Sequence, residues 1–210
     1  MTRVSRFKRG TILVAVLALL AAVTAGGLST PARAASTPAA PGILPAKIFF
    51  PQTGHNLGGD FLTAWQANGG LMTYGYPLTE PFTQNGMTVQ YFERARFEEH
   101  PDQAGTRYAV QATLLGNWAA RDLRSTKPFQ PIPGGSASKT TPDRIFFSQT
   151  GHYLAYGFKS YWESHGGLYV FGYPISEEFS QNGLTVQYFE RAVFEYHPEN
   201  KGTEYAVLLS

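Results

Sequence analysis

Glutamates at matching positions in two similar stretches of the chain are candidates for acid/base catalysis. They are Glu80, Glu93 and Glu98 in one stretch and Glu177, Glu190 and Glu195 in the other. Two carboxyl groups that flank a glycosidic bond can act as the acid and base of a glycosidase. A simpler interpretation is that these glutamates form ion pairs across a short antiparallel sheet, because units of about 70 residues seldom enclose a deep cleft. We therefore expect no catalytic residue among them.

Nucleophilic catalysis and metal binding have little support in the composition. The chain has no cysteine, and no serine lies between Pro45 and Thr113, so the two stretches share neither a thiol nor a serine nucleophile. Two histidines occur in each stretch at matching positions: His55, His100, His152 and His197. Their spacing matches no zinc motif, and two histidines fall short of the three or four ligands of a zinc site. We expect no metal site and no cofactor.

Aromatic residues are more numerous than units of this size can bury. The sequence holds 15 Phe, 12 Tyr and 3 Trp. Rings that stay at the surface can stack on a sugar or contact a protein partner. Those best placed to do so flank a glycine that precedes Tyr-Pro, namely Tyr74, Tyr76, Phe171 and Tyr173. We predict these four as candidate binding residues, with core packing as the alternative.

A duplication positions all of these side chains. Residues 45–113 align with residues 142–210 at a constant offset of 97 without a gap, and 39 of the 69 aligned positions are identical. A long ungapped match indicates two copies of one folded unit. We predict repeat unit 1 over residues 45–120 and repeat unit 2 over residues 142–210. Residues 121–141 are rich in Pro, Gly and Ser and are expected to form a flexible linker.

Each copy predicts a short helix followed by an antiparallel β-meander, so the predicted fold class is α+β with two tandem units. Leu57, Phe61 and Trp65 fall four apart and share one helical face, and Trp162 repeats the position of Trp65. Both tryptophans are therefore predicted to pack in the core. A Gly-Gly pair after each helix is expected to end it.

Turn residues in each copy complete the predicted meander. An Asn-Gly pair supplies the two positive φ angles of a type I′ hairpin turn. A glycine between two aromatic residues and before Tyr-Pro predicts a sharp corner. The structural residues predicted at these turns are Gly75, Gly172, Asn85, Gly86, Asn182 and Gly183.

Residues 1–34 predict a secretory signal peptide. Four basic residues precede an apolar run over residues 12–25, and Ala32-Arg33-Ala34 offers small residues for cleavage. The apolar run is shorter than the roughly 20 residues of a spanning helix, so no transmembrane anchor is expected after cleavage. An Ala/Pro linker is predicted over residues 35–44. The protein is therefore expected to be secreted.

The charge balance argues against nucleic-acid binding. The whole chain has a formal net charge of +2, with 17 Lys and Arg and 15 Asp and Glu. Five of the 17 bases and none of the acids lie in residues 1–34, so cleavage leaves a net charge of −3. Phosphate binding needs a clustered positive surface, which this balance does not predict.

The order of these motifs resembles a known family. Each copy has a Trp, a Gly-Gly pair, aromatic-Gly-Tyr-Pro, an Asn-Gly turn, Gln-Tyr-Phe-Glu and His-Pro. This order is similar to the LGFP-type repeat family of secreted bacterial cell-envelope proteins, and to repeats common in exported Chloroflexota proteins. The chain differs from the family in having Tyr or Phe and then Tyr in the Leu-Gly-Phe-Pro core. The resemblance implies a module associated with the cell wall.

We therefore expect a secreted, extracellular, non-catalytic repeat protein associated with the cell envelope. It is predicted to bind wall glycan or a surface partner through aromatic residues. The alternative from another class is a secreted hydrolase, or an accessory module, that acts on cell-wall polysaccharide. A third interpretation is a structural spacer that binds nothing.

Overall fold

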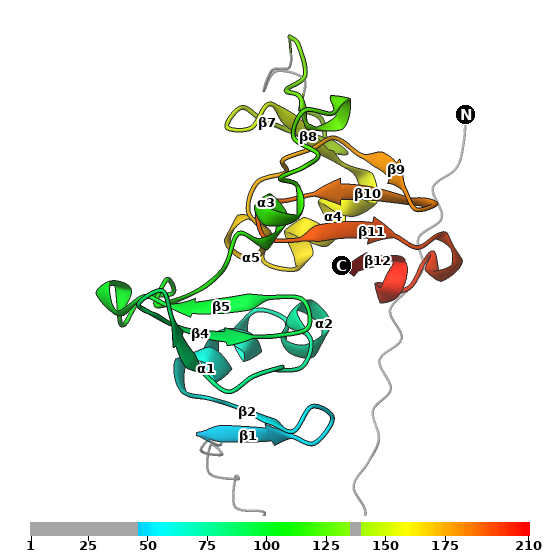
Figure 1. The fold of residues 1–210 in the computed structure, drawn as a ribbon. Helices are drawn as coiled ribbons and strands as arrows, with labels where there is room; N and C mark the ends of the chain where they lie inside the picture. Colours follow the sequence, from blue (N-terminus) through cyan, green and yellow to red (C-terminus); the bar gives the residue numbers. More distant parts are fainter. Residues whose placement is uncertain (1–45, 135–139) are drawn as a thin grey trace, which may run out of the picture. The chain divides into compact units, whose positions relative to one another are not determined.

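The computed structural model describes residues 46–134 and 140–210. The predicted signal peptide, the predicted linker at residues 35–44 and residues 135–139 of the second predicted linker lie outside the described residues. In the described part the fold is mixed α+β, with small antiparallel sheets, as the sequence predicts (Figure 1). The described residues of both repeats belong to one compact unit.

The two repeats have matching elements in the same order. The first contains β1 (Lys47–Phe50), β2 (His55–Gly58), α1 (Gly59–Ala67), α2 (Gly70–Tyr74), β3 (Phe82–Gln84), β4 (Met87–Tyr91), β5 (Arg96–Glu99) and β6 (Val110–Ala112). The second contains β7 (Arg144–Phe147), β8 (His152–Ala155), α4 (Tyr156–Ser164), α5 (Gly167–Phe171), β9 (Phe179–Gln181), β10 (Leu184–Tyr188), β11 (Val193–Tyr196) and β12 (Val207–Leu209). A short helix, α3 (Leu115–Ala119), lies between them in the sequence.

A four-stranded antiparallel meander forms the sheet of each repeat, in the order β3-β4-β5-β6 and β9-β10-β11-β12. In the first hairpin Gln84 pairs with Met87, which leaves a two-residue turn. Asn85 and Gly86 take φ angles of 51° and 80°, and their counterparts in the second repeat take similar values. These are the positive angles that a type I′ turn requires. The hairpins predicted from the Asn-Gly pairs are therefore confirmed.

The helix of each repeat begins later than the sequence pattern indicates. Helix α1 starts at Gly59, so Leu57 lies in β2, although its side chain is fully buried as expected. The helix ends before the Gly-Gly pair, where Gly69 takes a φ of 98°. The Gly-Gly stop is confirmed, while the extension of the helix back to Leu57 is wrong. Leu57 pairs with Ile48 across a β-hairpin, an interaction that the helical spacing does not reveal.

One hydrophobic core extends through both repeats. Phe97 packs against Tyr74 and Phe92 at ring-centroid distances of 4.7 and 4.6 Å, and Phe194 packs in the same way in the second repeat. The core cluster contains buried side chains from both copies. Because burial of apolar side chains is the main favourable term in folding, the shared cluster couples the stability of the two repeats.

The linker expected over residues 121–141 is not flexible in its described first part. Phe129 is only 6% exposed and packs with Ile175, Val186 and Tyr188 of the second repeat. The backbone of this stretch also forms a hydrogen bond with the second repeat, because Glu177 N donates to Pro128 O at 2.8 Å. The expectation is wrong for residues 121–134 because Phe129 and the partly buried Leu123 supply apolar anchors within a stretch rich in polar residues.

None of the helices in residues 46–134 and 140–210 combines the length and the apolar character needed to cross a membrane.

Candidate binding site

The predicted carboxylates form hydrogen bonds or ion pairs within their own repeats. The Glu80 carboxylate accepts hydrogen bonds from the Asn56 side chain and backbone, and these bonds lower the pKa of Glu80. Glu98 accepts from Arg96 at 2.7 Å and from the Thr113 hydroxyl at 2.8 Å. In the second repeat Glu177 accepts from Tyr153 N at 2.9 Å, and Glu195 lies 3.6 Å from the His197 ring.

The remaining pair, Glu93 and Glu190, holds the glycine corner in place. Glu93 Oε2 accepts from Tyr76 N at 3.1 Å, and Glu190 Oε2 accepts from Tyr173 N at 3.0 Å. The corner glycines, Gly75 and Gly172, take φ angles of 76° and 78°, and a β-carbon on Gly75 would overlap the Glu93 side chain. Only glycine fits this position for two independent reasons, the backbone angle and the lack of space.

The tryptophans of the predicted helices also support this corner. Trp65 Nε1 donates to Gly75 O at 3.1 Å, and Trp162 Nε1 donates to Gly172 O at 3.0 Å. Both rings are partly buried against the core, with T-shaped contacts to Phe50 and Phe147. Each indole therefore joins a helix to the corner through one hydrogen bond and one packed face.

Two of the four predicted binding residues are core residues. Tyr74 is 5% exposed and Phe171 is 1% exposed, so neither ring can stack on a ligand. This part of the prediction is wrong, because the residue before the corner glycine points inward onto Phe97 or Phe194. Burial also raises the pKa of the Tyr74 hydroxyl above its usual range.

Tyr76 and Tyr173 are half-buried and keep part of their surface open. They form equivalent T-shaped contacts, Tyr76 with Phe50 at 5.7 Å and Tyr173 with Phe147 at 5.6 Å. Their surroundings differ, because Tyr173 lines a hollow of about 480 Å³ and Tyr76 does not. The two glycine corners therefore pack in the same way, but only the corner of the second repeat has a tyrosine beside this hollow.

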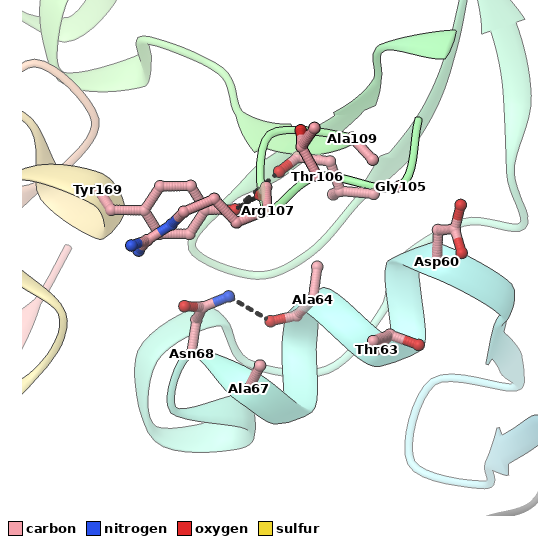
Figure 2. A pocket seen from close by; sticks show the side chains of 11 residues that line it. Asp60, Thr63, Ala64, Ala67, Asn68, Gly105, Thr106, Arg107, Ala109 and Tyr169 are labelled. Carbon is pink, nitrogen blue, oxygen red and sulfur yellow. Dashed lines mark hydrogen bonds between the residues drawn. The ribbon is translucent and has the colours of Figure 1, made fainter. Parts of the chain in front are cut away.

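Two hollows that share Arg107 and Tyr169 lie where the repeats meet. The first, of about 430 Å³, is shown in Figure 2 and is lined mainly by α1 and by residues 105–110 of the first repeat. The second, of about 480 Å³, is lined by Arg107, Tyr108, Gln111, Gly166, Leu168, Tyr169, Tyr173, Glu190 and Arg191. We call the two together the junction site. Their volumes fall within the range of small-molecule pockets, about 300 to 1,000 Å³.

Tyr169 and Arg107 form the shared wall of the junction site. The Arg107 guanidinium carbon lies 4.0 Å from the centroid of the Tyr169 ring, so the two side chains stack. The Tyr169 hydroxyl, a single donor, lies within hydrogen-bond distance of two carbonyl oxygens, Arg107 O, as Figure 2 shows, and Val110 O at 3.0 Å. Partial burial raises the pKa of this hydroxyl. These bonds cross from the second repeat to the first and fix the wall in position.

An arginine at the same position in the two copies has different partners. Arg94 donates to the carbonyl oxygens of Leu71, Met72 and Thr73 at the end of α2 in its own repeat. Arg191 instead donates from Nε to Ala112 O of the first repeat at 3.1 Å, and its side chain lines the junction site. In the second repeat this arginine therefore binds the first repeat and lines the junction site.

Sequence reasoning missed Arg107, Tyr108 and Tyr169, which contribute most to the junction site. The signal available was the difference between the copies, because Arg107 and Tyr169 correspond to Glu204 and Met72. Those two positions differ between the copies, whereas Tyr108 is repeated as Tyr205, so a comparison of the copies reveals only part of the junction site.

Histidines do not gather into a metal site in the described residues. There, no group of three or more His, Asp or Glu side chains could hold a metal ion together. His152 is buried and lies 3.1 Å from Glu177, whereas its counterpart His55 is more exposed and lies 3.8 Å from Glu80. His55 therefore begins β2 and lies beside a carboxylate.

Comparisons with known proteins leave the family open. A scan against protein-family models matched no family, and a search of curated proteins returned no match. The resemblance to LGFP-type repeats therefore stays a prediction from the motifs.

Proposed function

We propose that this chain is a secreted, extracellular, non-catalytic protein of the cell envelope that binds wall glycan at its junction site. The observation that carries the proposal is the set of three tyrosines, Tyr108, Tyr169 and Tyr173, around one hollow. Tyrosine rings present an apolar face and a polar tip, which suits the mixed surface of a sugar. Tyr108 is 49% exposed, so its ring is open to a ligand.

Polar groups beside these rings support a glycan as the ligand. Gln111 and Glu190 line the second hollow, and Asp60, Thr63 and Asn68 line the first. Amide, hydroxyl and carboxylate groups can hydrogen-bond sugar hydroxyls and fix their orientation. Arg107 and Tyr169 line both hollows, so we expect a ligand at either hollow to contact these two side chains.

The hydrogen bonds and ion pairs that the glutamates form within the fold favour a glycan-binding function over a hydrolytic one. A glycosidase needs two carboxyl groups on opposite sides of the scissile bond, one of them free to donate a proton. The predicted glutamates are already hydrogen-bonded or ion-paired within the fold, and Glu93 and Glu190 hold backbone N–H groups. We therefore retain the hydrolase only as the outcome that the binding assay can reveal.

Replacing Tyr173 with alanine should weaken retention on purified insoluble cell wall about tenfold, since a buried aromatic contact at a binding site is often worth more than about 1 kcal/mol. Tyr76→Ala is the matched control, because it removes the same T-shaped contact without touching the junction site. The two variants should therefore melt at similar temperatures while only Tyr173→Ala loses retention. Retention is measured by sedimentation of wall with bound protein over a range of protein concentrations.

The same tubes distinguish the rival functions. Soluble sugars released from the wall by the wild-type chain would support the hydrolase and oppose our proposal. Equal loss of retention in both variants would place binding at the two corners rather than at the junction. No retention of the wild-type chain would reject wall glycan as the ligand.

A further inference from the structure

Tyr156 has a backbone conformation that a tyrosine seldom adopts. Its φ is +46°, in the left-handed region, whereas the equivalent position in the first repeat is Gly59 with a φ of 57°. A bulky side chain in this region is strained, and such strain persists where the surrounding structure enforces it and is common at functional sites. The second repeat thus places a large ring where the first has no side chain.

The fold holds the Tyr156 backbone but not its ring. Tyr156 N donates to Asp143 O at 2.9 Å, and Tyr156 O accepts from the Ser160 hydroxyl at 3.1 Å. The side chain is 70% exposed, and within the described residues it forms no hydrogen bond or ring contact. Packing therefore does not explain the presence of an aromatic ring at this strained position.

The ring borders a hollow of about 330 Å³. Its lining residues are Tyr156, Gly157, Phe158, Glu178, Thr185 and Tyr196. None of them lines the junction site. We call this hollow the α4 hollow, because helix α4 begins at Tyr156.

The α4 hollow owes its chemistry to differences from the first repeat. Tyr156, Glu178 and Tyr196 stand where the first repeat has Gly59, Pro81 and Glu99. The changes add two tyrosine rings, and they place a carboxylate at position 178 while removing the one at the position of Tyr196. This combination is absent from the equivalent surface of the first repeat.

The lining of the α4 hollow carries one formal charge, and it is negative. Glu178 is its charged residue, and no Lys, Arg or His is among the lining residues. Glu178 is exposed to solvent, yet desolvation by the surrounding protein and, to a smaller extent, the neighbouring Glu177 raise the pKa of its carboxyl. A cation next to Glu178 would offset the cost of holding this carboxylate in its ionised form.

We propose that the α4 hollow binds an organic ammonium group, held between the rings of Tyr156 and Tyr196 and next to the Glu178 carboxylate. Aromatic faces attract alkylammonium cations through the quadrupole of the ring, and a carboxylate adds a direct charge interaction. A neutral ligand of the same shape would gain only the apolar contact. The inference is independent of glycan binding at the junction site.

The test titrates choline chloride into the full secreted chain and follows tyrosine resonances by NMR. Choline should bind in the millimolar range, and its neutral isostere 3,3-dimethylbutan-1-ol at least about tenfold more weakly, because the charge supplies much of the attraction. Tyr156→Gly should abolish binding of choline. Its melting temperature should be no lower than that of the wild type, since glycine readily adopts the left-handed conformation.

Two further variants make the outcome decisive. Glu178→Gln should weaken choline binding while leaving the isostere unaffected, and Tyr205→Ala, which removes an exposed tyrosine outside the α4 hollow, should change neither. Equal affinity for choline and its isostere, or unchanged choline binding in Tyr156→Gly, would overturn the proposal. Loss of wall retention in Tyr173→Ala with intact choline binding would show that the two sites act separately.

Discussion

Replacing Gly116 with alanine is expected to destabilise the chain by about 3 kcal/mol, the upper range for inserting atoms into a packed interface. Gly116 lies in α3, and its added β-carbon would overlap the carbonyl oxygen of Phe189 and stand 2.9 Å from Ala192 O. Both obstacles are backbone atoms of the second repeat, so rotation of a side chain cannot relieve them. The shift would also break the hydrogen bond from Asn117 N to Glu190 O.

The measurement is thermal unfolding followed by circular dichroism. A loss of this size lowers the melting temperature of a chain of this length by roughly 6 to 12 °C. Gly157→Ala is the matched control, because it also replaces a helical glycine, its φ is not positive, and the new β-carbon would meet no atom within 4 Å. That control should be neutral or slightly stabilising. An unchanged melting temperature in Gly116→Ala would mean that α3 does not pack on the second repeat.

Replacing Trp162 with alanine is expected to cost about 3 kcal/mol, the low end for removing a large aromatic side chain, since the ring is only partly buried. The substitution removes the hydrogen bond to Gly172 O and the contact with Phe147. It also leaves Gly167 unsupported, because the Trp162 ring packs against that glycine. Chemical denaturation measures the change in the free energy of unfolding.

Trp162→Phe separates the two contributions of the indole. It keeps an aromatic ring but loses the N–H donor and part of the indole volume, so we expect a cost of about 1 to 2 kcal/mol, less than for Trp162→Ala. Trp65→Ala should cost about as much as Trp162→Ala, because Trp65 has the same hydrogen bond and the same packing in the first repeat. A folded Trp162→Ala chain of unchanged stability would assign the ring to a surface role instead.

Hydrogen bonds and close packing join the two repeats around the junction site. The second repeat donates to the first from Tyr169 and Arg191, and α3 packs on the second repeat through Gly116. Residues of both copies line the junction site, so neither repeat alone contains all of it. Under the proposed function, duplication therefore creates one site between unlike faces rather than two equal sites.

Features that depend on neighbouring residues were predictable from the sequence. The Asn-Gly pairs predicted the two hairpin turns, because a turn is set by the φ angles of two or three adjacent residues. The duplication predicted the same order of elements in both copies. The glycine corners and the Gly-Gly stops were predictable for the same reason. Identity between the copies marked these positions.

The exposure of individual aromatic residues and the contacts between the repeats were not predictable from the sequence. Tyr74 and Tyr76 both flank Gly75 in the sequence, yet the Tyr74 ring is buried on Phe97 and the Tyr76 ring is only half-buried. Phe129 stands in a polar stretch and is buried by residues of a sheet about 50 positions later. The contacts between the repeats involve Arg107, Tyr169 and Gly116, whose partners lie far away in the chain. Such contacts form through long-range packing, which local propensity and spacing do not encode.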